Sequence, residues 1–514
     1  SRICSDGFID RANSDLRSFY LSSAYLGDKS SLRFNMLMGK EKTYQAWYGI
    51  SQDDLDAGRR SVNTAGTEKP GSPYDNETDN YWQNHYQLFF THRCNENLSF
   101  NTALFLTSGK GYYEQYKAGE TYTSYGLPGN GSSDFIRELW LDNDFFGNTF
   151  SVLLKGKKTA STLGGSVTRY NGKHFGELVW ASQGLPQPRY RWYDLTAHKT
   201  DWNLFFKQQV SVSNDLHLFY DLQFRPVRYT INGFRENPLL KIHNEYNFFN
   251  PKAGVSYIKN KWNYFFSAAL ASKEPNRDDF EAGMDQQPIP ERLIDLEAGT
   301  GWSGDADHFS GTIYYMRYKD QLVLTGKIND VGAYTRTNIP ESFRLGIELE
   351  GKYQLCKWMN IAATMNASQN KVLNFAEFID DYDMGGQQIK HYQRSDIAYS
   401  PSIVAGVAFS INILSSLSLD LLSKYVSRQN LDNTGVPGRS LDPFYVQDLR
   451  LEQKISPKWA KEINIIFQVN NLFNNSYEPN GYTYNYIYGG ELSVNNYYFP
   501  MAGINFIAGL NIKF

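Results

Sequence analysis

The chain has 514 residues and a formal net charge of −3, and aromatic residues make up 16% of it. The near balance of charges argues against a nucleic-acid partner, which needs a basic face, and the aromatic content excludes a disordered chain. No run of about 18 apolar residues occurs, so the sequence also excludes a membrane-spanning helix.

Apolar and polar residues alternate along many segments, which indicates strands with one apolar and one polar face. In chain order, about 19 segments are expected to form strands. They span 16–26, 31–39, 82–92, 97–106, 136–142, 148–156, 202–212, 215–225, 251–258, 261–272, 293–301, 308–318, 343–353, 358–367, 401–411, 416–425, 444–455, 461–470 and 496–514. In 343–353, for example, Leu345 and Ile347 share the face opposite to Glu348.

Short turns and long connections alternate between these strands. The short turns lie near 27–30, 93–97, 143–147, 213–215, 258–261, 302–307, 354–357, 412–416 and 456–460. The long connections include 107–135, 157–201, 319–342 and 368–400, and within 157–201 a hairpin is expected around Gly164 to Phe175. Short turns on one side and long loops on the other are typical of a bacterial outer-membrane barrel.

A barrel also explains the composition. Only helices and closed barrels satisfy every backbone polar group in lipid, and a barrel strand shows only every second residue to lipid, so the mean hydropathy stays at −0.52. Excess aromatic residues are expected to form girdles at both membrane interfaces. The predicted fold class is therefore all-β, an antiparallel transmembrane β-barrel. Because such barrels have even strand numbers, an odd count predicts a strand missing before Ser1.

Catalytic and metal-binding signatures are missing from the sequence. Cys4, Cys94 and Cys356 form no CxxC pair, and the eight histidines form no HExxH motif. Acidic clusters at 53–56 and 380–383 lack EF-hand spacing, so they are interpreted as solvated loop carboxylates, with a calcium site as the alternative. We expect no enzyme activity, no cofactor and no resident metal.

Several motifs follow one another in an informative order. They are Ser5–Arg11, Lys40–Trp47, Ser267–Phe280 ending in Glu-Pro-Asn-Arg-Asp-Asp-Phe, Pro290–Gly299, Gly346–Glu350, and Val-Asn-Asn-Leu-Phe-Asn at 469–474. In this order and spacing they resemble the barrels of TonB-dependent outer-membrane receptors, and the first two are similar to the Bacteroidetes branch. The resemblance covers most of the chain.

The resemblance implies a 22-stranded barrel filled by an N-terminal plug, and no plug motif occurs here. Residues 1–514 are therefore expected to form a receptor barrel domain that is incomplete at its N-terminus, lacking the plug and the first three strands. The implied function is TonB-driven uptake of a large, scarce nutrient across the bacterial outer membrane. An iron chelate (siderophore, ferric citrate or haem) is the preferred ligand.

Alternatives stay open at this stage. Within the family they are a cobalamin receptor or a glycan receptor, and outside it a passive porin or adhesin, a soluble glycan-binding β-protein, or an embedded hydrolase. The implied partners are the TonB complex through the plug, the barrel assembly machinery, the lipid bilayer with its lipopolysaccharide, and a small-molecule metal chelate. A surface lipoprotein is an additional candidate partner.

Candidate ligand residues combine arginine with aromatic side chains in the long loops. They are Tyr112, Tyr113, Tyr116, Arg189, Arg191, Trp192, Tyr334 and Arg336. Arginine donates forked hydrogen bonds to carboxylate or catecholate oxygens, and aromatic rings cover flat ligand faces. The alternative is a purely structural role, in which these residues pack the loops together or lie in the outer aromatic girdle.

The C-terminal segment has an apolar residue at every second position. Phe506, Leu510, Ile512 and Phe514 share one face. The pattern resembles the signal that the barrel assembly machinery reads, and a strand with an unpaired edge is open to capture by strand addition.

Overall fold

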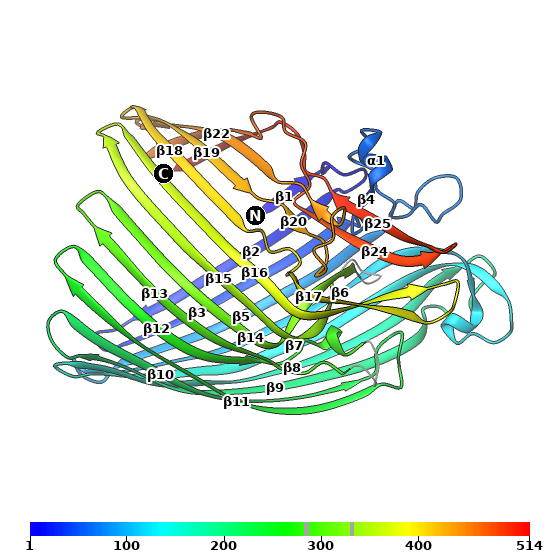
Figure 1. Ribbon diagram of the computed structural model, residues 1–514, viewed down its shortest axis with the longest axis horizontal. Coiled ribbons are helices and arrows are strands. Elements are labelled where there is room, and N and C mark those ends of the chain that lie inside the picture. Colours follow the sequence, from blue (N-terminus) through cyan, green and yellow to red (C-terminus); the bar gives the residue numbers. More distant parts are fainter. Residues whose placement is uncertain (282–286, 329–333) are drawn as a thin grey trace.

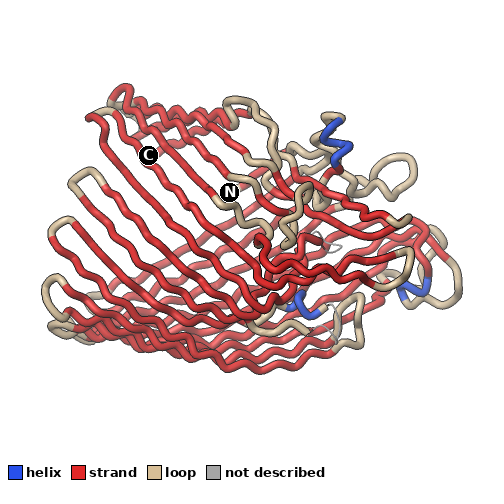
Figure 2. The backbone as a smooth tube through the Cα atoms, in the orientation of Figure 1, coloured by secondary structure: helices blue, strands red, loops and turns tan. Residues whose placement is uncertain are grey.

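The computed structural model describes residues 1–281, 287–328 and 334–514. A continuous wall is formed by β1 (Arg2–Ser5), β2 (Ser14–Leu26), β3 (Ser30–Tyr44), β5 (Thr78–Arg93), β6 (Leu98–Thr121), β7 (Ser132–Lys155), β8 (Thr159–Ala181), β9 (Tyr190–Ser211), β10 (Leu216–Asn232), β11 (Lys241–Lys259), β12 (Trp262–Lys273), β13 (Glu291–Ser303), β14 (His308–Ile328), β15 (Tyr334–Cys356), β16 (Met359–Asp381), β18 (Ile403–Leu414), β19 (Leu417–Val426), β22 (Phe444–Ile455), β23 (Glu462–Asn470) and β26 (Asn505–Lys513). Each pairs antiparallel with the next wall strand (Figures 1 and 2).

The remaining elements lie in the connections. They are β4 (Ile50–Ser51), α1 (Gln52–Asp56), η1 (Tyr122–Tyr125), η2 (Arg277–Phe280), β17 (Gln387–Asp396), β20 (Gln429–Asn430), β21 (Ser440–Leu441), β24 (Asn480–Tyr488) and β25 (Glu491–Phe499). In total, 24 strands join in one sheet, which confirms the predicted fold class. No helix in the described ranges is long and apolar enough to cross a membrane.

The predicted strand list is correct in most places and wrong in two regions. The last predicted strand, 496–514, is not continuous, because it covers the end of β25 and then β26 after a break at 500–504. Segments 136–142 and 148–156 are a single strand, β7, so the turn expected at 143–147 is wrong. The β6–β7 ladder runs through it without a shift, with Asn143 opposite Gly109 and Gly147 opposite Phe105. Asn and Gly favour turns, but here Asn143 and Gly147 lie in the lumen-facing row of a continuous strand, while Asp144 lies in the outward row with Phe146.

The true turn follows β7, where the Gly156 amide donates to the Thr159 carbonyl at 2.7 Å. Strand β8 was therefore missed, and most of 157–201 is wall rather than loop. The hairpin expected around Gly164 to Phe175 is wrong, because Gly164 lies inside the ladder opposite Ser151. A Cβ on Gly164 would meet the Phe205 ring at 2.6 Å, so glycine lets the ring lie flat on the strand.

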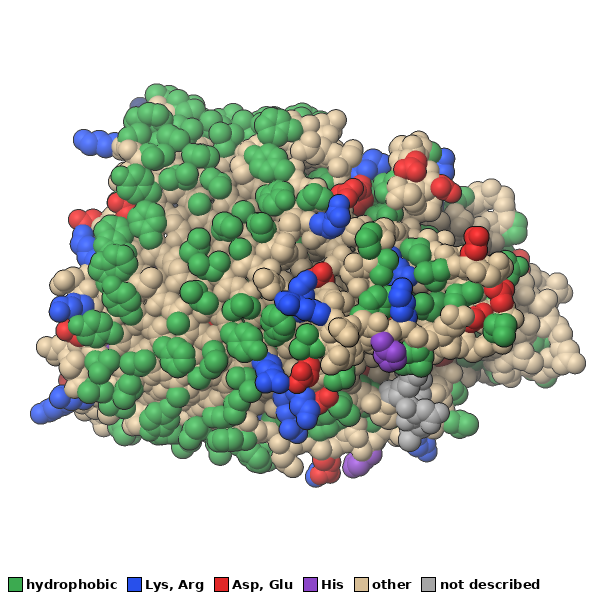
Figure 3. Space-filling view, viewed as in Figure 1, with side chains coloured by type: hydrophobic (Ala, Val, Ile, Leu, Met, Phe, Trp, Pro, Cys, Tyr) green, Lys and Arg blue, Asp and Glu red, His purple; other side chains and the backbone are tan. Residues whose placement is uncertain are grey.

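The predicted alternation is confirmed by the register. Ile313 lies directly opposite Ile347 and Leu345 opposite Tyr315, and such pairs share a face. These side chains are exposed, Ile313 by 58%. Figure 3 shows hydrophobic side chains spread over this surface of the wall. An apolar surface of this extent marks contact with lipid.

The opposite face of the wall is polar and lines the lumen. Ser22 donates to Asn35 Oδ1 at 2.8 Å, and His85 Nδ1 lies 2.9 Å from Thr107 Oγ1. Asn250 donates to Gln223 Oε1 at 2.8 Å. Water or a filling domain can satisfy such a surface, whereas lipid cannot.

The wall has two free edges in the described residues. β1 pairs only with β2, and β26 pairs only with β23. β1 adds one strand before the first predicted one, so the wall has 20 strands in the described residues and the expected odd count of 19 is wrong. The expectation of further strands and a plug before Ser1 is not tested by these residues.

The assignment of faces predicts that introducing arginine destabilises the barrel much more at a lipid-facing position of β14 than at the neighbouring lumen-facing position. Ile313→Arg puts a guanidinium against lipid and should destabilise the folded barrel by roughly 2–4 kcal/mol. Thr312→Arg faces the lumen opposite Glu348 and should cost less than about 1 kcal/mol. Urea titrations in phospholipid vesicles, read by the gel shift between folded and unfolded protein, measure both. Equal effects would contradict the assigned faces.

Candidate functional site

The connections opposite the short turns gather at one end of the wall, here called the mouth. Figures 1 and 2 show the short turns at the left and the longer connections at the right. Two described segments build its interior: the inner segment, residues 274–281, which includes η2, and the mouth loop, residues 427–443. Both are fixed by buried ion pairs rather than by the wall ladder.

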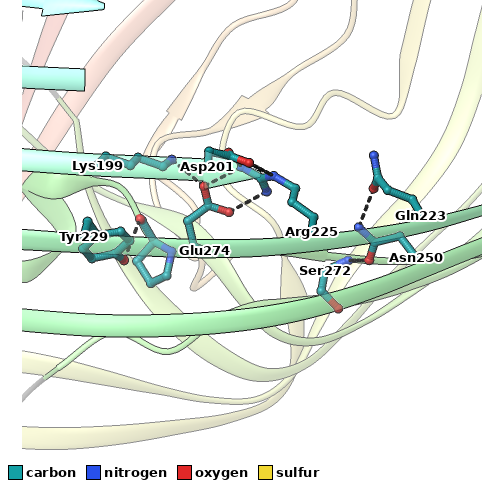
Figure 4. Close-up of polar contacts among 9 residues, drawn as sticks. Lys199, Asp201, Gln223, Arg225, Tyr229, Asn250, Ser272 and Glu274 are labelled. Atoms are coloured by element: carbon teal, nitrogen blue, oxygen red, sulfur yellow. Dashed lines mark hydrogen bonds and ion pairs between the residues drawn. The ribbon is translucent and has the colours of Figure 1, made fainter. Parts of the chain in front are cut away.

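Glu274 anchors the inner segment to two wall strands (Figure 4). Its carboxylate is 5% exposed and accepts from Lys199 Nζ at 2.5 Å and from Arg225 at 2.8 Å through both Nη atoms. Arg225 Nε also donates to Asp201 at 3.1 Å. Two cations and two anions therefore balance in one half-buried cluster.

The register explains why these side chains meet. Asp201 lies opposite Val227 and Lys199 opposite Tyr229, so alternate residues of β9 and β10 project into the lumen together. Tyr229 then donates from its hydroxyl to the Pro275 carbonyl at 3.2 Å. The chain leaves β12 at Lys273 and is drawn inward by these contacts.

The far end of the inner segment is held as well. Phe280 is fully buried and packs edge-on against Tyr229 with 5.6 Å between ring centroids. Asp279, whose side chain is 3% exposed, accepts from Arg336 Nε at 2.9 Å. The inner segment therefore bridges β10 and β15 across the lumen side of the wall.

The mouth loop is centred on Arg439, which is 2% exposed. Its Nη1 donates to Glu377 at 2.5 Å and to Asp432 at 3.0 Å. Glu377 also accepts from the Tyr392 hydroxyl at 2.7 Å, and Asn433 donates to the Leu324 carbonyl at 2.6 Å. One arginine thus joins the loop to β16 and β17.

Tyrosines from separate segments form a second feature of the mouth, here called the tyrosine cluster: Tyr334, Tyr399, Tyr482, Tyr484 and Tyr497. The rings of Tyr334 and Tyr399 are 5.0 Å apart, and those of Tyr482 and Tyr497 are 4.9 Å apart. Both Tyr334 and Tyr399 donate to the Gly481 carbonyl, at 2.6 and 2.8 Å. The cluster joins β15 to the β24–β25 hairpin.

The eight predicted ligand residues do not form one cluster. Tyr112 and Tyr116 share a face of β6 with Leu104 and Leu106, with no register shift between them, so they face outward. The Tyr112 ring lies 4.5 Å from that of Trp140, which places it in an aromatic row of the kind expected for the outer girdle.

Arg189 and Arg191 lie beside that row. Both donate to Glu177, at 2.8 and 2.9 Å, and Arg189 also pairs with Glu138. Arg191 covers the Phe175 ring at 3.9 Å. Their guanidinium groups are thus engaged by carboxylates and rings of the outer surface.

The other four lie elsewhere. Trp192 packs against the buried cluster of Tyr125, Phe135 and Leu178, with the Tyr125 ring 5.0 Å away. Tyr113 meets the Trp47 ring edge-on at 5.1 Å. Tyr334 belongs to the tyrosine cluster and Arg336 to the anchor of the inner segment, so these two lie at the mouth.

Sequence reasoning missed most of the residues that build the mouth. Lys199, Arg225 and Arg439 were not singled out, because each lies far in sequence from its partner. The tyrosine cluster left a signal, since Tyr482, Tyr484 and Tyr486 alternate in β24. That signal was missed because residues 471–495 fall between the last two predicted strands.

Neither acidic cluster of the sequence is organised around an ion. Asp54 completes the capping box of α1 by accepting from the amide of the N-cap residue Ser51, and it pairs with Arg59 at 2.6 Å. Asp383 accepts from the amides of Gly489 and Gly490 at 2.9 and 2.7 Å. Across residues 1–281, 287–328 and 334–514, no three His, Cys, Asp or Glu side chains converge as a metal site.

Glu77 is a buried carboxyl at the mouth that forms no ion pair with a described residue, although the charges of Lys117 and Arg137 act on it. Glu77 precedes β5, is 5% exposed and accepts from the Tyr116 amide at 3.0 Å. Burial raises its pKa from 4.5 to about 7. This group can change charge near neutral pH.

Comparison with known proteins identifies related folds. A family model described as TonB dependent receptor-like, beta-barrel matches residues 22–472. The siderophore receptor PiuA from Acinetobacter baumannii superposes with a TM-score of 0.72 at 13% identity, covering 98% of this chain and 75% of that one. The search of curated proteins found no match.

Two further solved structures show the same fold. The ferric-catecholate import receptor Fiu from E. coli K12 has a TM-score of 0.68 at 13% identity, covering 99% of this chain and 76% of its own. The ferric citrate transporter FecA has a TM-score of 0.70 at 15% identity, covering 97% and 70%. Identities this low establish a shared architecture and leave the ligand open.

The anchor of the inner segment predicts a local loss of stability on mutation. Glu274→Gln leaves Lys199 and part of Arg225 without an anion, and breaking such a buried pair costs about 2 kcal/mol or more. Hydrogen exchange of the amides of 274–281 should then become about 30-fold faster. Lys261→Gln removes an exposed pair with Asp305 and should leave this exchange unchanged. Unchanged exchange in Glu274→Gln would contradict the anchoring role.

The raised pKa of Glu77 predicts that the stability of the surrounding mouth segment depends on pH. Because the folded-state pKa is raised above the open-state value of 4.5, rising pH between about 4.5 and 7 favours opening of the segment around it. Glu77→Gln should therefore slow amide exchange of residues 45–78 at pH 8 relative to wild type, and leave it equal at pH 4.5. The exposed Asp75→Asn is the control. A wild-type to Glu77→Gln ratio that is the same at both pH values would contradict the assignment.

Proposed function

Because this chain belongs to the family of TonB-dependent receptor-like β-barrels, we propose that it is the barrel of an outer-membrane receptor that takes up a scarce metal chelate with energy from TonB. The observation that carries the proposal is the family match over 22–472 in a chain that folds as an antiparallel wall. The lipid-facing apolar surface and the polar lumen support placement in the bacterial outer membrane.

An iron chelate is the proposed ligand class. Two structural neighbours are named for ferric catecholate and ferric citrate, which supports the class by analogy of fold. Within this chain, support comes from the mouth, where Arg336 lies close to a cluster rich in tyrosine. Guanidinium and phenol groups donate hydrogen bonds to the oxygens of catecholates and carboxylates.

Among the eight candidate ligand residues, the geometry favours Tyr334 and Arg336. Both lie at the mouth, on the side from which a ligand would enter. Tyr112, Tyr116, Arg189 and Arg191 face outward, so a ligand in the lumen would not reach them from there. The proposed contact surface therefore combines Tyr334 and Arg336 with Tyr399, Tyr484 and Tyr497.

The proposal includes a plug and further wall strands outside residues 1–514. Unpaired backbone edges do not persist in lipid, and β1 and β26 each present one. Additional strands between them would close the wall. The plug would fill the lumen and connect it to the TonB complex, and the exposed Phe506, Leu510, Ile512 and Phe514 of the C-terminal segment remain the proposed assembly signal.

Uptake assays in the source bacterium test this function. Deletion of the gene should abolish accumulation of radioactive iron from one chelate among ferric catecholate, ferric citrate, other siderophores and haem, and loss of TonB should abolish the same uptake. Labelled cobalamin and oligosaccharides are parallel arms for the alternative ligands. Uptake that persists without TonB would contradict the proposal and favour a passive porin.

A further inference from the structure

The inner segment fixes its backbone on both sides of one arginine, Arg277. Glu274 and Asp279 are held by cations of the wall, and Phe280 is fully buried. At the start of η2, the Asn276 amide donates to the Asp279 carboxylate at 2.6 Å. Arg277 lies between these anchors, and its side chain is 26% exposed. Its position is therefore set by its neighbours in the chain rather than by its own contacts.

The Arg277 guanidinium has few acceptors around it. It lies over the Phe234 ring, with 4.6 Å between the guanidinium carbon and the ring centroid. Its Nε is buried and has no hydrogen-bond partner among the described residues. Its one ionic contact in this part of the chain is with the adjacent Asp278 at 3.4 Å, and that carboxylate is 65% exposed. A cation that is partly desolvated and weakly paired gains from a closer anion.

The two anchors leave no carboxylate over for Arg277. The cluster around Glu274 is neutral, with two cations and two anions (Figure 4). Asp279 is bound to Arg336 at 2.9 Å, and its side chain is 3% exposed. Both anchoring carboxylates are thus balanced by wall cations, and the charge of Arg277 remains available on the lumen side.

Polar side chains of the wall line the lumen next to Arg277. Tyr170 lies directly opposite Lys199 in the β8–β9 ladder, and the Lys199 ammonium projects into the lumen. The charge of Arg277 acts on Tyr170, and the side chains of Asn143 and Tyr81 interact with Tyr170 as well. Phenol and amide groups can donate hydrogen bonds, so they add donors beside the guanidinium.

Glycines keep this part of the lumen open. A Cβ on Gly172 would meet the Tyr170 hydroxyl at 2.6 Å, and one on Gly111 would meet the Tyr81 ring at 2.5 Å. Both rings therefore lie flat along the wall instead of standing out from it. The flat rings leave room for a bound molecule next to Arg277.

Carboxylates of the lumen wall lie farther from this point. Asp79 on β5 is separated from Tyr170 on β8 by β6 and β7, and Glu41 on β3 is one strand farther still. Their charges act on Tyr81. An anionic group in the lumen is therefore favoured beside Arg277 and Tyr170, and disfavoured near β3 and β5.

We propose that Arg277 receives a carboxylate or catecholate group of the transported chelate, so that the receptor takes anionic chelates in preference to uncharged ones. A guanidinium binds planar oxyanions through two parallel N–H donors, and the Tyr170 hydroxyl and Asn143 amide add further donors. The inference rests on the proposed function and deepens it, because it names the charge of the ligand and assigns its recognition to the inner segment instead of the long loops.

Binding of chelates of radioactive iron to the detergent-purified full-length receptor tests the inference. The probes are ferric citrate and ferric dihydroxybenzoate, which carry carboxylate and catecholate oxygens, and an uncharged ferric trihydroxamate. Wild type should bind at least one anionic probe at least about tenfold more tightly than the uncharged one. Arg277→Gln should weaken that binding by about tenfold or more and leave the uncharged probe unaffected.

Two further variants isolate the guanidinium. Arg277→Lys keeps the charge and loses the forked donors, so its affinity should fall between those of wild type and Arg277→Gln. The matched control is Arg228→Gln, which removes an arginine that faces away from the lumen and pairs with Glu245. It should bind every probe like wild type. Wild type that binds neither anionic probe, or binds the uncharged probe as tightly, would overturn the inference, as would an equal loss in Arg277→Gln and Arg228→Gln.

Hydrogen exchange separates recognition from folding. The amides of 274–281 should exchange as in wild type in Arg277→Gln, because the anchors at Glu274 and Asp279 remain. Faster exchange would overturn direct recognition, since displacement of the inner segment would then explain the lost binding. TonB-dependent uptake without any preference for anionic probes would overturn this inference alone, whereas uptake that persists without TonB would overturn the transport proposal whatever Arg277 binds.

Discussion

The structure depends on one constraint, the need to pair every backbone amide and carbonyl of the wall where water is absent. An unpaired group in hydrocarbon costs several kcal/mol, so the strands must follow one another in a continuous antiparallel ladder. That ladder fixes which residues face lipid. Once Ile313 is opposite Ile347, every second residue of β14 and β15 is committed to lipid and the others to the lumen. The intrinsic conformational propensity of a single residue then has little influence on the face it takes.

The same constraint explains what the sequence could predict. The wall face is a local pattern, so alternation located nearly all its strands and eight of the nine short turns. The error at 143–147 arose because Asn143, Asp144 and Gly147, which lie on both faces of one strand, looked like a turn, and because Gly164 and Gly165 looked like a loop. Contacts at the mouth are of another kind. Glu274 meets Lys199 across 75 residues, and Arg439 meets Glu377 across 62. No local pattern encodes such a pair.

Charge is used differently on the two faces of the wall. Inside, Glu274 and Arg439 are desolvated and each is balanced by opposite charges, because an unbalanced buried charge is strongly unfavourable. These balanced clusters hold segments in place. Outside, Arg292 and Lys319 remain exposed, and Lys319 lies directly opposite Glu341 in the β14–β15 ladder. A charge that stays hydrated costs little, so the outer face needs no desolvated clusters of this kind.

This division suggests why the mouth rather than the wall would set ligand choice. Substituting a wall residue disturbs a ladder that neighbouring strands share, whereas the tyrosine cluster rests on a few side-chain contacts such as Tyr334 to the Gly481 carbonyl. Replacing one of these rings changes the surface offered to a ligand and leaves the ladder unchanged. Structural neighbours at 13–15% identity retain the wall. Sequences can diverge this far and keep the architecture, because the wall needs only alternating apolar and polar residues, which many sequences satisfy. Ligand recognition instead needs particular groups in particular places.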